Sequence, residues 1–178
     1  MPFDITSIFE RSDAYGADLR RVEATLEQFA SDHPYLLFDQ TAIGRIRRIA
    51  GADARLQARF ARSLGETAGQ SGPTDVRTLV KQRARRLITT AFVALTADDS
   101  RRLPALSASR SMLIAVCSAV SWRERQVIRS FLDCAETAVA VACAYDWLYE
   151  ELSPDERHAI EQALLCQVLE PALAAFED

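Results

Sequence analysis

The chain has 178 residues, of which 49% are hydrophobic and 26% charged, and its formal net charge is −4. These values are those of an ordinary globular protein, and the sequence holds no run of about 18 apolar residues, which excludes a transmembrane helix. Ala, Leu, Arg and Glu dominate, Gly and Pro number six each, and runs of strand-forming residues are almost absent. The composition therefore predicts an all-α protein.

Apolar residues recur at helical spacing between recognisable caps and breaks, which predicts a series of helices. The expected helices span residues 17–30, 41–50, 54–67, 75–97, 106–120, 131–149 and 154–169. We divide the chain into an N-terminal irregular segment with the first helix, residues 1–32, and a helical domain over residues 33–178. Because the links between helices are short, antiparallel helical hairpins are the expected unit.

Local signals set several of these boundaries. Asp39 is placed to cap the second helix, and Ser153, followed by Pro154 and two carboxylates, is a strong helix start. Residues 98–102 are polar and predict a turn, whereas Pro171 predicts a break after the last long helix.

Charge is unevenly distributed along the chain. Residues 45–86 hold eleven Arg or Lys and three Asp or Glu, whereas residues 131–178 hold one Arg and eleven Asp or Glu. This asymmetry has two interpretations: helix faces that pair with each other across the fold, or a surface that faces a polyanion. The arginines that would attract a polyanion are Arg45, Arg48, Arg83 and Arg86.

The four cysteines are Cys117, Cys134, Cys143 and Cys166. Because all lie in apolar helical stretches and none forms a CxxC motif, we expect buried, reduced thiols. His33 and His158 are not at ligand spacing to any cysteine, so we expect no metal site and no cofactor. The first 17 residues carry charges and no apolar stretch, which together with free thiols favours the cytoplasm. A chain whose signal peptide had been removed would instead belong to the periplasm.

The most informative segment is residues 131–152, which read FLDCAETAVAVACAYDWLYEEL. From Cys134 to Ala144 the residues are small and apolar, except for Glu136 and Thr137. A helix that is apolar on all sides is buried on all sides, so we expect this one to be an inner helix that packs on more than one face. Tyr145 and Asp146 are expected to close the packing against the next hairpin.

Four side chains of this segment are candidate substrate-binding residues. Asp133 and Glu136 are three residues apart and share a helix face. Glu136 is a carboxylate among apolar residues, and it either pairs with an arginine, caps a neighbouring helix end, or lies at the mouth of a binding cleft. Trp147 and Tyr149 are either core residues or platforms for sugar rings.

The string SFLDCAETAVAVACAYDWLYEELSPDERHAIEQAL resembles a signature segment of heparinase II/III-type polysaccharide lyases, a group that includes alginate and oligoalginate lyases. The family segment has the form FLD-x-AE, small apolar residues, YDWLY, and then LSP-x-ER at the start of the next helix. The segment from His33 to Phe38 and the position of Trp122 also resemble the family pattern. The resemblance is sharp over residues 122–165, loose over residues 33–121, and adds little over residues 1–32.

This resemblance implies an incomplete (α/α) toroid, followed in the family by a β-sandwich domain, and cleavage of uronic-acid polysaccharides by β-elimination. The family's catalytic groups are an Asn-His pair, a Tyr and a further His, all of which lie beyond the LSP-x-ER helix. This chain ends at Asp178 before those motifs and contains no asparagine. We therefore expect no catalytic residue, and no lyase activity from this chain alone.

Three functions stay open on the sequence. The first is the N-terminal toroid portion of a polysaccharide lyase, whose exposed apolar edge would promote self-association. The second is a non-catalytic helical module that binds acidic glycans, and the third is a helical scaffold for protein interactions. We expect an acidic polysaccharide or oligosaccharide as the partner, and neither nucleic acid nor a membrane.

Overall fold

The computed structural model describes residues 33, 34, 36–68, 76–119, 121, 122 and 131–177. Contacts divide the chain into two compact units, Met1–His33 and Pro34–Asp178. The helix expected over residues 17–30 lies outside the described residues. The fold described below is that of the second unit.

All regular structure in the described part of the chain is helical and none of it is strand, which confirms the all-α class. The helices are α3 (Gln40–Ala52), α4 (Ala54–Ala68), α5 (Val76–Thr96), α6 (Asp99–Cys117), α7 (Phe131–Leu148), α8 (Pro154–Leu164) and α9 (Glu170–Glu177). A short 3₁₀ turn, η2 (Tyr149–Glu151), links α7 to the start of α8, and a π-helical turn, η3 (Leu165–Leu169), joins α8 to α9.

Two predicted helix starts are confirmed by their capping hydrogen bonds. The Asp39 carboxylate accepts a hydrogen bond from the backbone N–H of Ala42 at 2.7 Å. At α8 the Ser153 hydroxyl accepts from the N–H of Glu156 at 3.3 Å, and the Glu156 carboxylate accepts from the N–H of Ser153 at 2.8 Å. This reciprocal pair is a capping box, and it satisfies two backbone donors that the first turn would otherwise leave without partners.

The start of α6 was predicted wrongly. The polar residues 98–102, interpreted as a turn, form the cap and the first turn of the helix, which begins at Asp99 rather than near Leu106. The Asp98 carboxylate accepts from the N–H of Arg101 at 3.2 Å and so supplies the cap. Pro104 lies inside the helix, six residues after the cap, so the carbonyl of Ser100 loses its usual helical donor.

Pro171 was expected to break the last helix, but the helix continues past it as η3 and α9. Proline has no backbone N–H, so the carbonyl of Gln167, four residues earlier, loses its usual helical donor. The thiol of Cys134 on α7 lies 3.3 Å from that carbonyl and donates to it. The chain therefore accommodates Pro171 through a wider turn and a donor from a neighbouring helix.

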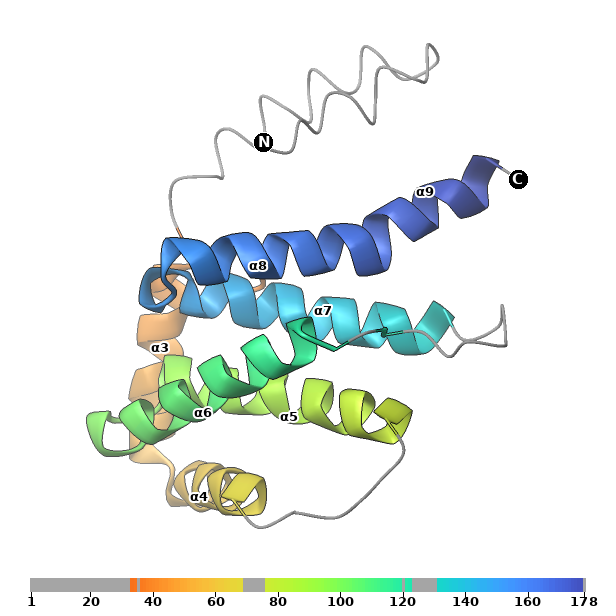
Figure 1. The fold of residues 1–178 in the computed structure, drawn as a ribbon. Coiled ribbons are helices and arrows are strands. Elements are labelled where there is room, and N and C mark those ends of the chain that lie inside the picture. Colours follow the sequence, from red (N-terminus) through yellow and green to blue (C-terminus); the bar gives the residue numbers. More distant parts are fainter. Residues whose placement is uncertain (1–32, 35, 69–75, 120, 123–130, 178) are drawn as a thin grey trace. The chain divides into compact units, whose positions relative to one another are not determined.

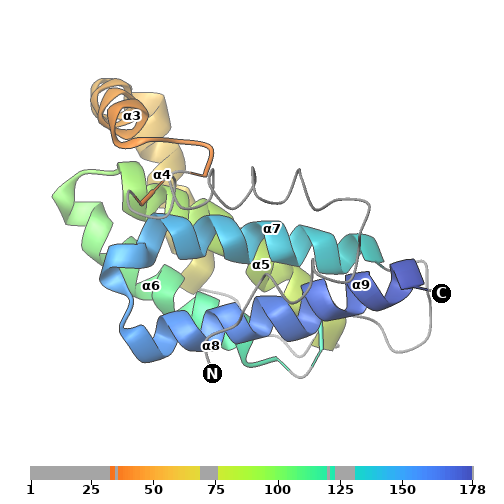
Figure 2. The same ribbon diagram turned by 90° about the horizontal axis from the view of Figure 1, so that it is seen from above.

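Helices α5 and α6 form one antiparallel hairpin, and α7 and α8 form a second (Figure 1). The first helices of the two hairpins, α5 and α7, run in the same direction and pack against each other, while α6 packs on both α7 and α8. Figure 2 shows α3 near the turn that connects α5 to α6, and α3 and α4 both contact α5. Helix α5 is therefore the central element, because it contacts α3, α4, α6 and α7.

Helix α7 is the inner helix that its small residues predicted. It packs against α5, α6 and α8, and Cys134, Val141 and Ala144 are fully buried. The expectation of burial on all sides was wrong at one strip, because Val139 is 58% exposed. Val139 therefore faces outward, away from the helices that cover the rest of α7.

An aromatic cluster forms the centre of the core at the C-terminal end of α7. It joins Phe92 of α5 to Phe38, Phe60 and Trp147, with ring centroids 5.9 to 6.3 Å apart. These rings come from four segments that are distant in the sequence, and aromatic pairs at such separations stabilise beyond the area they bury. None of the described helices is long and apolar enough to cross a membrane.

Candidate functional site

The predicted site residues are spread along α7 rather than gathered at one point. Glu136 and Trp147 are eleven residues apart on the same face, which is roughly 16 Å along a helix axis. Between them lie Ala140 and Ala144, both buried against neighbouring helices. Asp133 belongs to α7, but its side chain lies outside the described residues.

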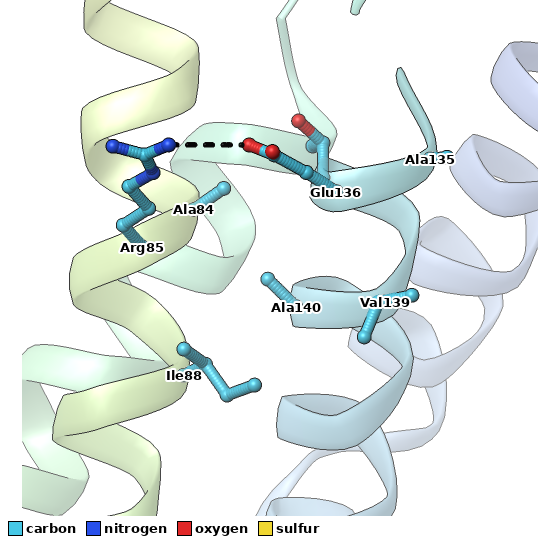
Figure 3. A pocket seen from close by; sticks show the side chains of 8 residues that line it. Ala84, Arg85, Ile88, Ala135, Glu136, Val139 and Ala140 are labelled. Atoms are coloured by element: carbon cyan, nitrogen blue, oxygen red, sulfur yellow. Dashed lines mark ion pairs between the residues drawn. The ribbon is translucent and has the colours of Figure 1, made fainter. Parts of the chain in front are cut away.

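Glu136 forms an ion pair with Arg85 of α5 (Figure 3). The distance from Arg85 Nη2 to Glu136 Oε2 is 3.6 Å, and the two side chains are 69% and 39% exposed. Of the alternatives left open by the sequence, pairing with an arginine is therefore present in the structure. An exposed pair at this separation contributes between about 0 and 1 kcal/mol to stability.

A pocket of about 420 Å³ opens beside this ion pair, between α5 and α7 (Figure 3). Its lining residues are Ala84, Arg85, Ile88, Ala135, Glu136, Thr137, Val139 and Ala140. Apart from the paired charges and Thr137, the lining residues are alanine, isoleucine and valine. A sugar ring placed here would lose water from its hydroxyls without gaining partners, so the pocket suits an apolar group.

Trp147 is a core residue in this fold. It is 8% exposed, its ring packs against Phe38 and Phe92, and its indole N–H donates to the carbonyl oxygen of Leu36 at 3.0 Å. A tryptophan that stacks on a sugar needs an open ring face, and both the ring and the N–H of Trp147 are engaged inside the protein.

Asp146 also binds the backbone of Leu36. Its carboxylate, 2% exposed, accepts a hydrogen bond from the N–H of Leu36 at 2.8 Å. Asp146 was expected to face the next hairpin, and it binds the Pro34–Phe38 segment instead. The N–H and the carbonyl of Leu36 are thus bound by two adjacent side chains of α7, which we call the Leu36 clamp. The next residue, Leu37, has φ of 68° and is 72% exposed.

Tyr149 lies beyond the end of α7 in a group of polar side chains from α7 and α8. The guanidinium carbon of Arg157 lies 3.8 Å from the centre of the Tyr149 ring, and Arg157 Nε donates to the Tyr149 carbonyl at 3.1 Å. Tyr145 stacks edge-on against Tyr149 and donates its hydroxyl proton to Glu161. Burial and the carboxylate of Glu161 raise the pKa of Tyr145, which makes it a poor general base.

A second pocket of about 420 Å³, polar in character, lies where α3 meets the turn between α5 and α6. Its lining residues are Arg47, Gly51, Thr96, Ala97, Asp98, Asp99 and Arg102. None of these residues was predicted to belong to a site. Residues 45–86 are rich in arginine, but the local sequence does not show which of these arginines lines a pocket.

The other arginines proposed to attract a polyanion occupy different settings. Arg45 and Arg48 are exposed on α3 and form no ion pair within the described part of the chain, whereas Arg86 is half-buried and has interactions. The side chain of Arg83 lies outside the described residues. The alternative interpretation, pairing between the basic and acidic stretches, is realised by Arg85 and Glu136.

The cysteines are free thiols, but they are not all buried. Cys134 and Cys143 are buried and Cys117 is half-buried, whereas Cys166 is exposed on the π-helical turn, contrary to expectation. Burial raises the pKa of the Cys117 thiol to about 12, which leaves it unreactive. Within the described ranges, no three His, Cys, Asp or Glu residues come together in a way that would hold a metal ion.

No protein-family model matches the chain, and no curated protein matches it.

Proposed function

We propose that the chain is the N-terminal toroid portion of a polysaccharide lyase of the heparinase II/III type and that it binds uronic-acid polysaccharide. The observation that carries the proposal is the position of α7. The helix that bears the lyase-like segment is an inner helix, and it runs parallel to α5 as the first helix of the second of two hairpins. Repetition of such hairpins side by side is how an (α/α) toroid is built.

We assign binding to this chain and no catalytic step. Proton abstraction from C5 of a uronate needs a positioned base whose pKa lies near the working pH. The hydroxyl of Tyr145 donates to Glu161 and its pKa is raised, so it does not meet that requirement. His158 is exposed on α8. Activity toward the polysaccharide therefore needs groups other than those described here.

Calorimetric titration with acidic oligosaccharides tests the proposal. We expect saturable heat on addition of alginate oligomers, none on addition of neutral cello-oligosaccharides, and weaker binding at higher salt, because added ions screen exposed arginines beyond about 10 Å at 0.1 M. Flat titrations with alginate and with glucuronate-containing glycosaminoglycan oligomers, at low salt, would overturn the assignment.

A second function, a helical scaffold for protein interactions, is favoured by one observation. The apolar pocket between α5 and α7, with the exposed Val139 on its lining, has the chemistry of a receptor for an apolar side chain. The same titrations separate the two functions, since a protein-binding scaffold gives no heat with either kind of oligosaccharide. Self-association through the exposed apolar residues Leu169 and Leu173 stays a prediction.

A further inference from the structure

The polar pocket between α3 and the α5–α6 turn differs from the α5–α7 pocket in the groups it offers. Three elements enclose it: Arg47 and Gly51 come from α3, Thr96 and Ala97 from the end of α5, and the remaining lining residues from the start of α6. Its volume of about 420 Å³ lies within the range of small-ligand sites, which is roughly 300 to 1,000 Å³. It holds guanidinium and carboxylate groups in one cavity.

Arg47 is the principal donor of this pocket. Its side chain is exposed, and its Nε donates to the carbonyl oxygen of Leu95 at 2.8 Å. That bond fixes the guanidinium at the C-terminal end of α5, where helix carbonyls favour a positive charge. A guanidinium has five N–H donors, and Arg47 forms no ion pair with any residue that the structure describes. The planar fork of the other donors is suited to a carboxylate.

The opposite side of the pocket supplies acceptors. Asp98 is engaged as the cap of α6, and the hydroxyl of Ser100 is the main cause that lowers its pKa. Asp99, the first residue of α6, forms no hydrogen bond or ion pair within the described ranges. Arg102 is held at the rim by Glu151, with Nη2 at 2.7 Å from Oε1. Asp99 is therefore the carboxylate that is available to accept from a ligand.

We propose that this pocket binds one uronate unit of an acidic glycan, with the sugar carboxylate on Arg47 and a sugar hydroxyl donating to Asp99. The inference rests on the proposed function and gives it a site. A sugar acid fits because it combines one negative charge with several hydroxyl donors, which matches one free fork and one free carboxylate. The exposed Arg45 and Arg48 on the same helix add attraction for the rest of the polymer.

The charges around the pocket disfavour nucleic acid as the occupant. Asp98, Asp99 and Glu151 are as numerous here as the nearby Arg47, Arg101 and Arg102. A phosphodiester backbone carries one charge for each phosphate and offers no hydroxyl donors along its charged edge, so it would meet these carboxylates without compensation. Binding of single-stranded DNA with an affinity equal to that for alginate oligomers would contradict the inference.

Two variants test the site with alginate oligomers as the probe, in the full chain. Arg47→Gln removes the charge and the fork, and we expect affinity to fall on the order of tenfold, the loss of one charge-assisted hydrogen-bonded pair. Gly51→Leu fills the pocket from α3. A Cβ at Gly51 meets no heavy atom within 4 Å, so the leucine side chain starts in open space and the fold is expected to persist. We expect a similar loss of affinity.

Each variant has a matched control. Gly44→Leu makes the same change on the same helix, again with no neighbour within 4 Å, but outside the pocket. Arg62→Gln removes one exposed charge from α4. Both are expected to bind as the unaltered chain does, to within about twofold, since screened surface charges contribute little. Helix content by circular dichroism checks that all four variants fold.

The outcomes separate the site from the function. If the unaltered chain binds alginate oligomers and both pocket variants bind equally well, the uronate site is wrong while the proposed function stands. If Arg47→Gln weakens binding and Gly51→Leu does not, charge attraction explains the effect and the pocket is again wrong. If the unaltered chain binds no acidic oligosaccharide, the site and the proposed function both fail.

Discussion

Both ends of helix α7 carry an acidic residue beside the stretch of small residues, but the two ends are used differently. At the C-terminal end, Asp146 and Trp147 are buried, and both bind the backbone of Leu36. At the N-terminal end, Glu136 is partly exposed, its ion pair with Arg85 spans 3.6 Å, and a pocket opens beside it. One helix therefore contains a region that holds the fold together and a region that leaves a surface open.

This difference shows that the conspicuous part of a motif need not be the part that binds a ligand. The aspartate and tryptophan of the YDWLY string have the residue types of a sugar site, but their polar atoms are satisfied inside the protein. The polar pocket at Arg47 arises where no motif marks the sequence. Truncation of Trp147 and loss of charge at Glu156 and at Glu136 test the contrast, with the largest effect expected at Trp147.

Trp147→Ala should have the largest effect on stability. It removes a buried ring from the aromatic cluster together with one hydrogen bond of the Leu36 clamp, and we expect the free energy of unfolding to fall by about 3 to 5 kcal/mol. Urea denaturation followed by circular dichroism measures the change. Trp147→Phe keeps an aromatic ring but lacks the N–H donor. Its free energy of unfolding should lie between that of the unaltered chain and that of Trp147→Ala.

Val139→Ala is the matched control for the same helix. Val139 is 58% exposed, and its truncation should change the free energy of unfolding by less than about 0.5 kcal/mol. Equal losses for the Trp147 and Val139 truncations would mean that the two ends of α7 do not differ in the way described.

Glu156 offers an intermediate case, because its ion pair is better formed than that of Glu136. Arg110 Nε and Nη2 each lie 2.8 Å from a different oxygen of the Glu156 carboxylate. The Arg110 guanidinium and the N–H of Ser153 lower the pKa of Glu156 from 4.5 to about 2. Glu156→Gln keeps the residue type of a capping box but loses the charge, and should cost about 1 kcal/mol at neutral pH.

The stabilisation by the Glu156 ion pair should depend on pH. Because the pKa of Glu156 is lower in the folded state, the ion pair stabilises fully above the ordinary pKa of 4.5 and is lost as pH falls toward about 2. The urea midpoints of the unaltered chain and of Glu156→Gln should therefore converge in acid. A difference that stays constant from neutral pH to about pH 2.5 would show that the carboxylate charge is not responsible.

Apart from the Val139 control, Glu136→Gln should have the smallest effect. The partners are 69% and 39% exposed and 3.6 Å apart, so the loss should not exceed about 1 kcal/mol and should shrink with added salt. Thermal denaturation at low and high salt measures it. A loss as large as that of Trp147→Ala would show that the N-terminal end of α7 is part of the stabilising core after all.

The sequence was informative where local chemistry decides structure. The caps at Asp39 and Ser153 each act over three residues, and both were predicted correctly. The small residues of α7 predicted an inner helix because close helix packing demands them. Predictions failed at residues 98–102, which form the cap and first turn of α6, and at Pro171, where the helix continued past a residue that usually ends one. In the second case a thiol donor from another helix compensates, which no local pattern reveals.

The candidate site depended on contacts that are distant in sequence. Leu36 and Asp146 are 110 residues apart, so nothing in the string YDWLY showed that its aspartate would bind a backbone amide rather than a ligand. Arg47 reaches Leu95 across 48 residues, and Arg47 also lines the polar pocket. Residue types showed which chemical groups the chain contains. Only the tertiary arrangement showed which of these groups are used inside the fold and which line a pocket.

The Leu36 clamp also determines where this helical unit can be cut. Leu37 holds a left-handed backbone conformation that costs a leucine roughly 1 to 2 kcal/mol, and it is flanked by the clamped Leu36 and by Phe38 in the aromatic cluster. A chain that began at Asp39, the N-cap of α3, would start at a helix boundary. The shorter chain would nevertheless lack the Leu36 N–H that donates to the Asp146 carboxylate, and it would lack the Phe38 ring that packs against Trp147. The compact unit accordingly begins at Pro34, several residues ahead of its first helix.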